Sequence, residues 1–350
     1  MNSSPDTLAV KPRTVSIESV RRQLQTGQQV RITLTPFLVR RSRQEFGPNV
    51  GSYVKCELGD ESGWIEAVWW EGGKLPKLEL ESLMAAEVWS VSGFASINHY
   101  GGKKTPQIKI ETARPLVGMS PLDIQGLVRR SARSEEELSS WLTDCIDSIA
   151  NTPLQRLLME SIGRDSKWHI PFLRTPAALF YHHAYVGGLA DHVKEMVSVW
   201  SASRSVYPNV DGDLTLAGIL LHDVGKLDTI SSSSAPQLAL TGRYIDHIST
   251  GISRLTSDID RIPGFPTLLR DQLLHIVASH HGEKEYGSPV VPATREAIIV
   301  HHLDRMSSLL SHLEEWTRQS GVDSNGWTTE PSPWIKANLA GSTRIPNTFE

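Results

Sequence analysis

The chain has 350 residues, 39% of them hydrophobic and 21% charged, with a net charge of −4. This length favours two domains, and no run approaches the roughly 18 apolar residues of a membrane helix. The acidic balance argues against a protein that coats DNA electrostatically. The polar N-terminus lacks the apolar core of a secretory signal. Cys56 and Cys145 are too few for a disulfide framework or a thiolate zinc site, so a reducing, cytoplasmic setting is expected.

The first third of the chain reads as a small β-barrel. Residues 1–13 are predicted to be a flexible tail, and residues 14–118 a β-rich domain. Val30, Ile32 and Leu34 alternate with polar residues, as in a half-buried strand. Residues 51–70 form two strands joined by a glycine-bounded turn, and further strands are expected near 87–97 and 105–113. Five short strands predict an OB-fold.

After Pro115 the pattern becomes helical. Residues 119–150 are predicted to be a helical linker, residues 151–315 an all-α bundle and residues 316–350 a C-terminal tail, with a loop at 231–234. Ser134 and Glu137 form a capping box that opens one helix. Between Leu189 and Trp200 the apolar residues fall on one helix face. The predicted fold class is therefore β followed by α in two domains.

The apolar helix that ends in "LLHDVGK" carries the first chemical signal. An ionised Asp223 buried beside His222 is costly unless something pairs with both. A metal ion would do so, and Gly225 stands where a helix end favours glycine. One His-Asp pair does not establish a metal site, so the remaining ligands must come from elsewhere in the chain.

The histidines supply the candidates, because only His99 of the 13 precedes residue 160. His192 lies one turn into the predicted helix 189–200, and Asp304 shares a helix face with His301. Imidazoles and carboxylates without thiolates suit Mn, Fe, Zn or Mg, and the centre of a helix bundle is a common place for such sites.

Three stretches together carry a family resemblance: "YHHAYVGGLADHVKEMV", "GILLHDVGKLD" and "SHHGEKEYGSPVVPATREAIIVHHLDRM". They resemble the HD-domain metal-dependent phosphohydrolases, and within them the YhaM-type 3′-to-5′ exoribonucleases, in which an OB domain precedes the HD domain. The resemblance covers roughly residues 20–315. This chain departs from it at Asp191, where the family pattern has Glu.

The resemblance implies roles for individual residues. The primary metal ligands would be His192, His222, Asp223 and Asp304. The histidines that match a second metal position are His247 and His280, and His281 is included because either member of the His-His pair could face the site. Asp223 and Lys226 would be catalytic, with Lys226 contacting the phosphate. The cofactor would be one or two divalent ions, Mn²⁺ first and Mg²⁺, Co²⁺ or Fe²⁺ as alternatives.

Several of these residues also have a structural interpretation. His182 and His183 could contact substrate phosphates or could cap a helix. His247 could be an ordinary surface histidine, and Lys226 a solvated lysine at a helix end.

Basic and aromatic residues in the loops of the predicted barrel suggest contact with a nucleic-acid strand. The basic candidates for substrate binding are Arg40, Arg41, Arg43, Lys103 and Lys104, and the aromatic ones are Phe46, Tyr53 and Tyr100. Bases stack on rings while phosphates meet cations, although solvated loop charges would look the same. Trp69 is assigned to the barrel core with Ile65 and Ala67, and the roles of Trp64 and Trp70 stay open.

We therefore expect a metal-dependent 3′-to-5′ exonuclease that acts on single-stranded RNA, with single-stranded DNA as a further substrate, and releases nucleoside monophosphates. One alternative is an HD phosphohydrolase of a small nucleotide or cyclic dinucleotide. The other is a catalytically weak nucleic-acid-binding adaptor. No membrane partner is expected, and assembly into a homo-oligomer is left open.

Overall fold

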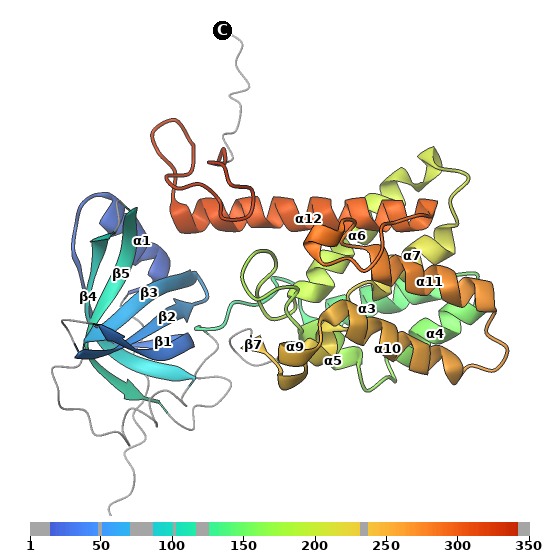
Figure 1. Ribbon diagram of the computed structural model, residues 1–350, viewed down its shortest axis with the longest axis horizontal. Coiled ribbons are helices and arrows are strands. Elements are labelled where there is room, and N and C mark those ends of the chain that lie inside the picture. The colour runs from blue at the N-terminus through green and yellow to red at the C-terminus, as the bar shows by residue number, and fades with distance from the viewer. Residues whose placement is uncertain are drawn as a thin grey trace, which may run out of the picture. The chain divides into compact units, whose positions relative to one another are not determined.

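The computed structural model describes residues 15–47, 51–70, 87–100, 103–116, 126–231 and 237–341. The chain divides into two compact units, residues 1–129 and 130–350. The first contains a closed barrel and the second is helical (Figure 1). The prediction of a five-stranded barrel followed by a helical domain is therefore confirmed. The predicted tail 1–13 and residues 232–234 of the predicted loop lie outside the described residues.

The barrel closes in the order β1-β2-β3-β5-β4. Its strands are β1 (Val30–Gly47), β2 (Gly51–Asp60), β3 (Gly63–Trp70), β4 (Val88–Tyr100) and β5 (Lys103–Pro115). All neighbouring pairs are antiparallel except β3 and β5, which run parallel. The predicted hairpin is confirmed, since Asp60 pairs with Gly63 across a tight turn.

Strand β1 is long enough to pair with β2 along one part and with β4 along another. Its register shifts between Ile32 and Thr35 and again between Arg40 and Arg43. Leu34 (φ 42°) and Arg41 (φ 53°) have left-handed backbone conformations at these shifts. Bulges of this kind bend a strand and increase its twist, which is what closing a barrel requires.

Alternating apolar residues fill the barrel. Ile65 and Ala67 of β3 are fully buried and Trp69 is 7% exposed, so their predicted core face is confirmed. A helix that the sequence reading missed, α1 (Ile17–Gln25), precedes β1. It begins with the Ser16 side chain as its cap and adds Ile17, Val20 and Leu24 to the same core.

The second unit is a bundle built around one apolar helix. Its long helices are α3 (Glu135–Asp147), α4 (Thr152–Ile162), α6 (Gly188–Ser203), α7 (Gly212–Leu221), α10 (His247–Asp260), α11 (Thr267–Ser279) and α12 (Arg295–Ser320). The shorter elements are α5 (His169–Arg174), α8 (Lys226–Thr229), α9 (Leu240–Tyr244) and a two-stranded ribbon of β6 (Ile230–Ser231) and β7 (Gln237–Leu238). Helix α7 packs against α4, α6, α11 and α12, which explains why it is hydrophobic all round.

The helix signals of the sequence are confirmed where they were strongest. The capping box at Ser134 opens α3, and the apolar face between Leu189 and Trp200 is buried on α6. Helix α3 falls in the predicted linker but joins the core of the second unit.

The predicted boundary at residue 315 falls inside α12, which continues to Ser320. Residues 321–341 then fold back on themselves, with Val322 bridged to Thr328 and Trp327 to Ala340. Among the described helices, none is both long and apolar enough to cross a bilayer.

Candidate metal centre

Three helix ends and two helix faces bring the predicted ligands together. His192 lies on α6, His222 is the residue that ends α7, and Asp223 follows in the turn to α8. His247 is the first residue of α10, and His280 ends α11, followed by His281. Asp304 completes the set from α12. Side chains that project inward from five neighbouring helical segments can surround one small volume, as in other sites built in the core of a helix bundle.

The first group of ligands comprises His192, His222 and Asp304, whose ligand atoms all lie within 4.8 Å of one another. The Nε2 atom of His192 is 3.3 Å from Oδ1 of Asp304. Both imidazoles are completely buried, and the Asp304 side chain is 13% exposed. This spacing is compatible with one shared cation.

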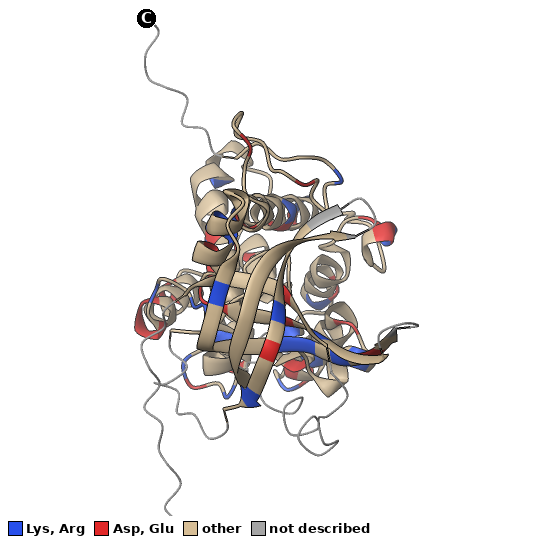
Figure 2. Cartoon of the chain, turned by 90° about the vertical axis from the view of Figure 1, so that its left-hand side faces the viewer, with Lys and Arg blue, Asp and Glu red and all other residues tan. Residues whose placement is uncertain are grey.

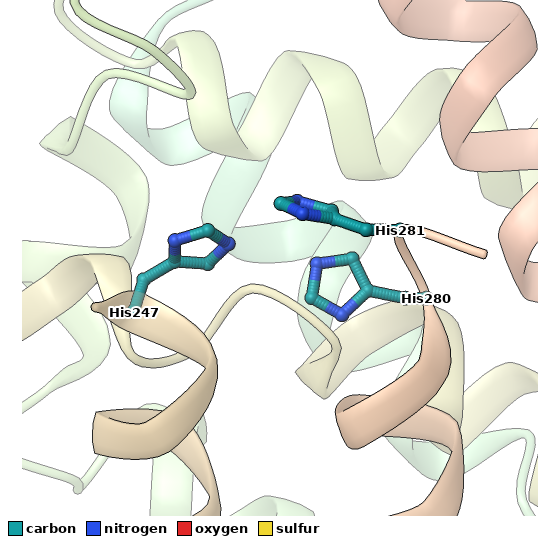
Figure 3. Close-up of side chains that lie close together, drawn as sticks. All are labelled: His247, His280 and His281. Carbon is teal, nitrogen blue, oxygen red and sulfur yellow. The ribbon is translucent and has the colours of Figure 1, made fainter. Parts of the chain in front are cut away.

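The second group comprises His247, His280 and His281, and its ligand atoms also lie within 4.8 Å of one another. The three rings face a common space from the start of α10 and the end of α11 (Figure 3). His281, the least certain of the sequence-based candidates, thus lies with the other two.

Asp223 lies between the two groups. Its Oδ2 atom is 3.2 Å from Nε2 of His222, and its Oδ1 atom is 3.5 Å from Nε2 of His247 and 3.6 Å from Nε2 of His280. One carboxylate therefore presents one oxygen to each group. This is the geometry of a ligand that can bridge two cations.

Buried polar atoms without partners show that the residues present fit a metal. The described part of the chain contains ten buried side-chain atoms with no hydrogen bond, and half of them belong to this cluster. They are Nε2 of His192, His222, His247 and His280 and Oδ1 of Asp223. Buried polar atoms are nearly always hydrogen-bonded in folded proteins, so this concentration of unpaired ones fits a site that can hold a cation.

The charge states of these groups are those that bind metal. Burial opposes ionisation of Asp223, yet the Lys226 ammonium and the His222 imidazole hold its pKa well below the usual range. Burial likewise opposes ionisation of Asp304, but neighbouring imidazoles keep its pKa well below the usual range. Burial lowers the pKa of His247 to about 3 and that of His281 to about 4. At His222 burial opposes ionisation of the imidazole, but the neighbouring Asp223 carboxylate raises its pKa. Ionised carboxylates beside the neutral imidazoles of His247 and His281 are ready to coordinate a cation.

Hydrogen bonds at Nδ1 fix the orientation of the ligand imidazoles. His222 and His280 each donate from Nδ1 to a backbone carbonyl, of Ile219 at 2.9 Å and of Val277 at 2.7 Å. A carbonyl only accepts, so the proton is on Nδ1 and the Nε2 lone pair points into the site.

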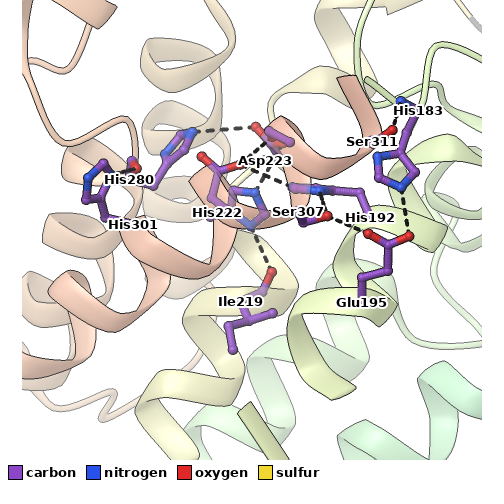
Figure 4. A network of polar contacts seen from close by, with 12 residues as sticks. His183, His192, Glu195, Ile219, His222, Asp223, His280, His301, Ser307 and Ser311 are labelled. Atoms are coloured by element: carbon purple, nitrogen blue, oxygen red, sulfur yellow. Dashed lines mark hydrogen bonds and ion pairs between the residues drawn. The ribbon is translucent and has the colours of Figure 1, made fainter. Parts of the chain in front are cut away.

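His192 is oriented through two residues that the sequence reading did not identify. Its Nδ1 atom is 3.0 Å from the Ser307 hydroxyl, which donates to Oε2 of Glu195 at 2.7 Å (Figure 4). Because the carboxylate accepts the hydroxyl proton, His192 must donate from Nδ1 and keep Nε2 free. Glu195 and Ser307 each follow a predicted ligand, His192 and Asp304, by three residues, and this spacing on a helix is the signal that would have found them.

His182 and His183 separate into two environments. The buried His183 side chain is 3.0 Å from Oε1 of Glu195, and its backbone N–H donates to the Ser311 hydroxyl, which favours a structural role. The His182 ring lies 5.6 Å from the His192 ring. Lys226, the first residue of α8, donates to Oδ2 of Asp223 at 2.5 Å and is almost completely buried.

The basic candidates on the barrel are mostly engaged with acidic neighbours. Arg40 is buried, lies over the Trp64 ring at 3.9 Å and pairs with Glu57 at 2.6 Å, which favours a structural role. Arg41 pairs with the same Glu57 at 3.1 Å but is half-exposed. Figure 2 shows both basic and acidic segments on the barrel strands that face the viewer.

Arg43 pairs with Glu45 at 2.5 Å and is also largely exposed. The side chains of Lys103, Lys104 and Tyr100 lie outside what the structure describes.

Exposed aromatic residues gather on neighbouring strands of the barrel. Tyr53 of β2 and Trp70 of β3 are paired across the strands, with ring centroids 4.6 Å apart. Trp70 is 45% exposed. Phe46 of β1 is 78% exposed, but it pairs with Ser52 whereas Tyr53 pairs with Glu45, so its side chain lies on the other face of the sheet. Trp70, whose role the sequence left open, is therefore part of an aromatic surface.

Comparisons with known proteins agree with this geometry. The family model for the HD domain matches residues 179–309, a range that contains all the ligands named above. The 3′-5′ exoribonuclease YhaM of Oceanobacillus iheyensis is 32% identical over 79% of this chain and 84% of its own length. The YhaM proteins of Halalkalibacterium halodurans and Bacillus subtilis are 31% and 28% identical, again over 79% of this chain and over 83% and 85% of their own lengths.

Proposed function

This chain belongs to the YhaM family of 3′-5′ exoribonucleases, and from that premise we propose that its helical unit is a metal-dependent exonuclease that shortens single-stranded RNA from the 3′ end. The observation that carries the proposal is the Asp223 carboxylate, with one oxygen toward each of two imidazole groups. The products would be nucleoside monophosphates, released one at a time.

Two divalent cations are proposed, one for each group of ligands, with Mn²⁺ as the working ion and Mg²⁺, Co²⁺ or Fe²⁺ as alternatives. The first would be held by His192, His222 and Asp304, and the second by His247, His280 and His281, with Asp223 shared. When bound, such ions supply Lewis-acid activation of water and neutralise phosphate charge.

The residues of the chain itself would prepare the phosphodiester for attack. Lys226, 2.5 Å from Asp223 and nearly buried, would stabilise the charge that develops on the nonbridging phosphate oxygens. Asp223 keeps that ammonium oriented toward the site. Both would act in a volume from which helices α6, α7 and α12 exclude much of the solvent, where such electrostatic contacts are stronger than in water.

The barrel is proposed to hold the single strand. Tyr53 and Trp70 offer ring faces on which bases can stack, and Arg41 and Arg43 are exposed enough to reach phosphates. This aromatic surface favours a polymer over a small nucleotide, and the ligand set favours an enzyme over an adaptor. Single-stranded DNA has the same bases and phosphates and is proposed as a weaker substrate.

A cytoplasmic location is proposed as well. Cys56 and Cys145 are free and buried, as is usual in a reducing compartment.

End-labelled RNA tests the function directly. With Mn²⁺, a 5′-labelled single strand should shorten progressively, and a 3′-labelled strand should release its label first as a mononucleotide. A 3′-blocked strand should resist. Internal cuts at the start of the reaction, or turnover of free nucleotides alone, would contradict the proposal. The Asp223→Ala variant should be inactive while it still binds RNA, and the exposed Asp260→Ala variant serves as the matched control.

A further inference from the structure

The segment 321–341 brings an aromatic side chain close to the metal centre. The Trp334 ring lies 5.9 Å from the His182 ring, which in turn lies 5.6 Å from the ligand His192. Tyr181, next to His182 in the chain, has its ring centroid 5.8 Å from that of Trp334. The rings of Tyr181, Trp334 and His182, from two distant parts of the sequence, therefore form a series of contacts that ends at the proposed metal ligand His192.

A single buried histidine fixes the two parts in place. His312 on α12 donates from Nδ1 to the Tyr181 carbonyl at 3.2 Å, so its Nε2 atom accepts from the Ser332 hydroxyl at 2.7 Å. The Ser332 oxygen in turn accepts the backbone N–H groups of Trp334 and Ile335. The donor and acceptor roles are mutually consistent along this chain of bonds, so the Tyr181 and Trp334 rings are held in register.

Both rings remain partly accessible. Tyr181 is 46% exposed, and Trp334 and His182 are half-buried. A tryptophan that served only to fix this segment would be expected to bury its ring among aliphatic side chains, whereas Trp334 faces other aromatic rings beside the site. Such an arrangement offers flat faces to a planar ligand.

We propose that Tyr181 and Trp334 form a platform on which the base of the 3′-terminal nucleotide stacks while its phosphate lies at the metal centre. This inference rests on the proposed function. Aromatic faces stack any base, so the platform would position the terminal nucleotide with little dependence on sequence. The segment 321–341 would then be a part of the active site rather than a tail.

The surroundings of the platform suit an uncharged ring better than a phosphate. The rings that contact Tyr181 and Trp334 are each other and the imidazoles of His182 and His312. The positive charge of the site is on Lys226, beside Asp223. The phosphate and the base would therefore be recognised by different groups, Lys226 with the cations and Tyr181 with Trp334.

A cycle of two changes tests the platform. The change in the protein is Trp334→Ala. The change in the substrate is removal of the terminal base: one RNA ends in adenosine, and the other has the same sequence but ends in an abasic ribose. On the adenosine substrate the variant should raise KM about 10- to 100-fold with little change in kcat, the effect expected for one lost stacking contact. On the abasic substrate the variant should match the wild-type protein, because nothing remains to stack.

A matched control and a spectroscopic readout accompany the cycle. Trp327→Ala removes a 49% exposed tryptophan of the same segment and should leave KM unchanged. Tyr181→Ala and Trp334→Phe provide further variants, with partial retention expected for phenylalanine. In a chelator, RNA with 2-aminopurine at its 3′ end should lose fluorescence on binding the wild-type protein and keep it with Trp334→Ala.

Equal KM effects on the two substrates, or unchanged quenching in Trp334→Ala, would overturn the platform. Failure of the wild-type protein to shorten RNA from the 3′ end would instead contradict the proposed function.

Discussion

The protonation state of each ligand imidazole is set by what its Nδ1 atom contacts. His222 and His280 use backbone carbonyls, whereas His192 depends on the Ser307 hydroxyl and, through it, on Glu195. Backbone contacts are difficult to change by mutation, but the Glu195 contact can be altered without touching a ligand. Glu195 therefore offers a test of how these ligands are positioned.

Glu195→Gln should weaken metal binding. A glutamine amide can donate to Ser307, which would turn the hydroxyl proton toward His192 and move the imidazole proton to Nε2, where it blocks coordination. Affinity for Mn²⁺, measured by titration calorimetry, should fall about 10- to 100-fold, as is typical when the partner of a ligand histidine is lost. Glu314→Gln, an exposed change on α12, is the control. Unchanged affinity for Mn²⁺ in the Glu195 variant would show that the hydrogen bonds from Glu195 through Ser307 do not orient His192.

The metal-free protein should lose stability as pH falls. In the folded state, burial lowers the pKa of His247 to about 3 and that of His281 to about 4. An unfolded histidine titrates near 6.5, so below that pH only the unfolded state gains protons at these two positions. The free energy of unfolding should therefore decrease from about pH 6.5 toward pH 4. Urea unfolding in a chelator at several pH values measures this, and His281→Asn should weaken the dependence. A stability that rises over this range would contradict the burial of neutral imidazoles.

The candidate ligands that the structure brings together could be proposed from the sequence, but the residues that support them could not. His192, His222, Asp223 and Asp304 were recognisable because histidine and aspartate occur in three distinctive stretches. Glu195 and Ser307 are ordinary polar helix residues whose role depends on two helices being neighbours. The same limit applies to Arg40, which reads as a free cation in sequence and is paired with Glu57 in the fold.

At the level of elements, the turn between α7 and α8 must approach α10 closely. A Cβ atom on Gly225 would lie 1.9 Å from the carbonyl oxygen of His247. The backbone of Gly225 has φ −67°, a conformation that any residue can adopt, so conformational freedom does not require glycine at this position. The reason for glycine here is the space required at the start of α10.

Gly225→Ala should therefore damage the second metal position. The added methyl group must push His247 away from Asp223, whereas His192, His222 and Asp304 are held by other elements. The number of Mn²⁺ ions bound per chain should fall from two toward one, with a loss of nuclease activity. Gly212→Ala, where the nearest contact is 4.0 Å away, should leave both positions filled. Two ions retained by the Gly225 variant would argue against the packing described here.

Elements were predictable where one face is apolar and periodic. The barrel strands, α3 and α6 show this pattern, and the structure confirms them. Helix α7 was recognisable instead from its continuous apolar run. Helix α1 was missed because it has only three buried positions, and the end of α12 was missed because its last turns are polar. The fold of residues 321–341 depends on hydrogen bonds to α12 such as that of Ser332 with His312, which leave no periodic pattern in the sequence.

At the level of the whole molecule, we propose different tasks for the two units, RNA binding for the barrel and chemistry for the helical unit. Trp70→Ala should lower the affinity for long single-stranded RNA about 10-fold through the loss of one stacking contact. Cleavage of a dinucleotide, which is too short to need the barrel, should be unaffected. Filter binding and initial rates measure the two effects, with Trp327→Ala as the control. If Trp70→Ala reduced dinucleotide cleavage as much as it reduced the affinity for long RNA, Trp70 would stabilise the fold rather than contact the RNA.

The central claim is that seven side chains from separate helix ends and helix faces hold two cations on either side of Asp223. Crystals grown with Mn²⁺ and measured for anomalous scattering test it most directly. The account predicts two peaks, one among His192, His222 and Asp304 and the other among His247, His280 and His281, each in contact with Asp223. No peak at either group, or ions that do not contact Asp223, would contradict it.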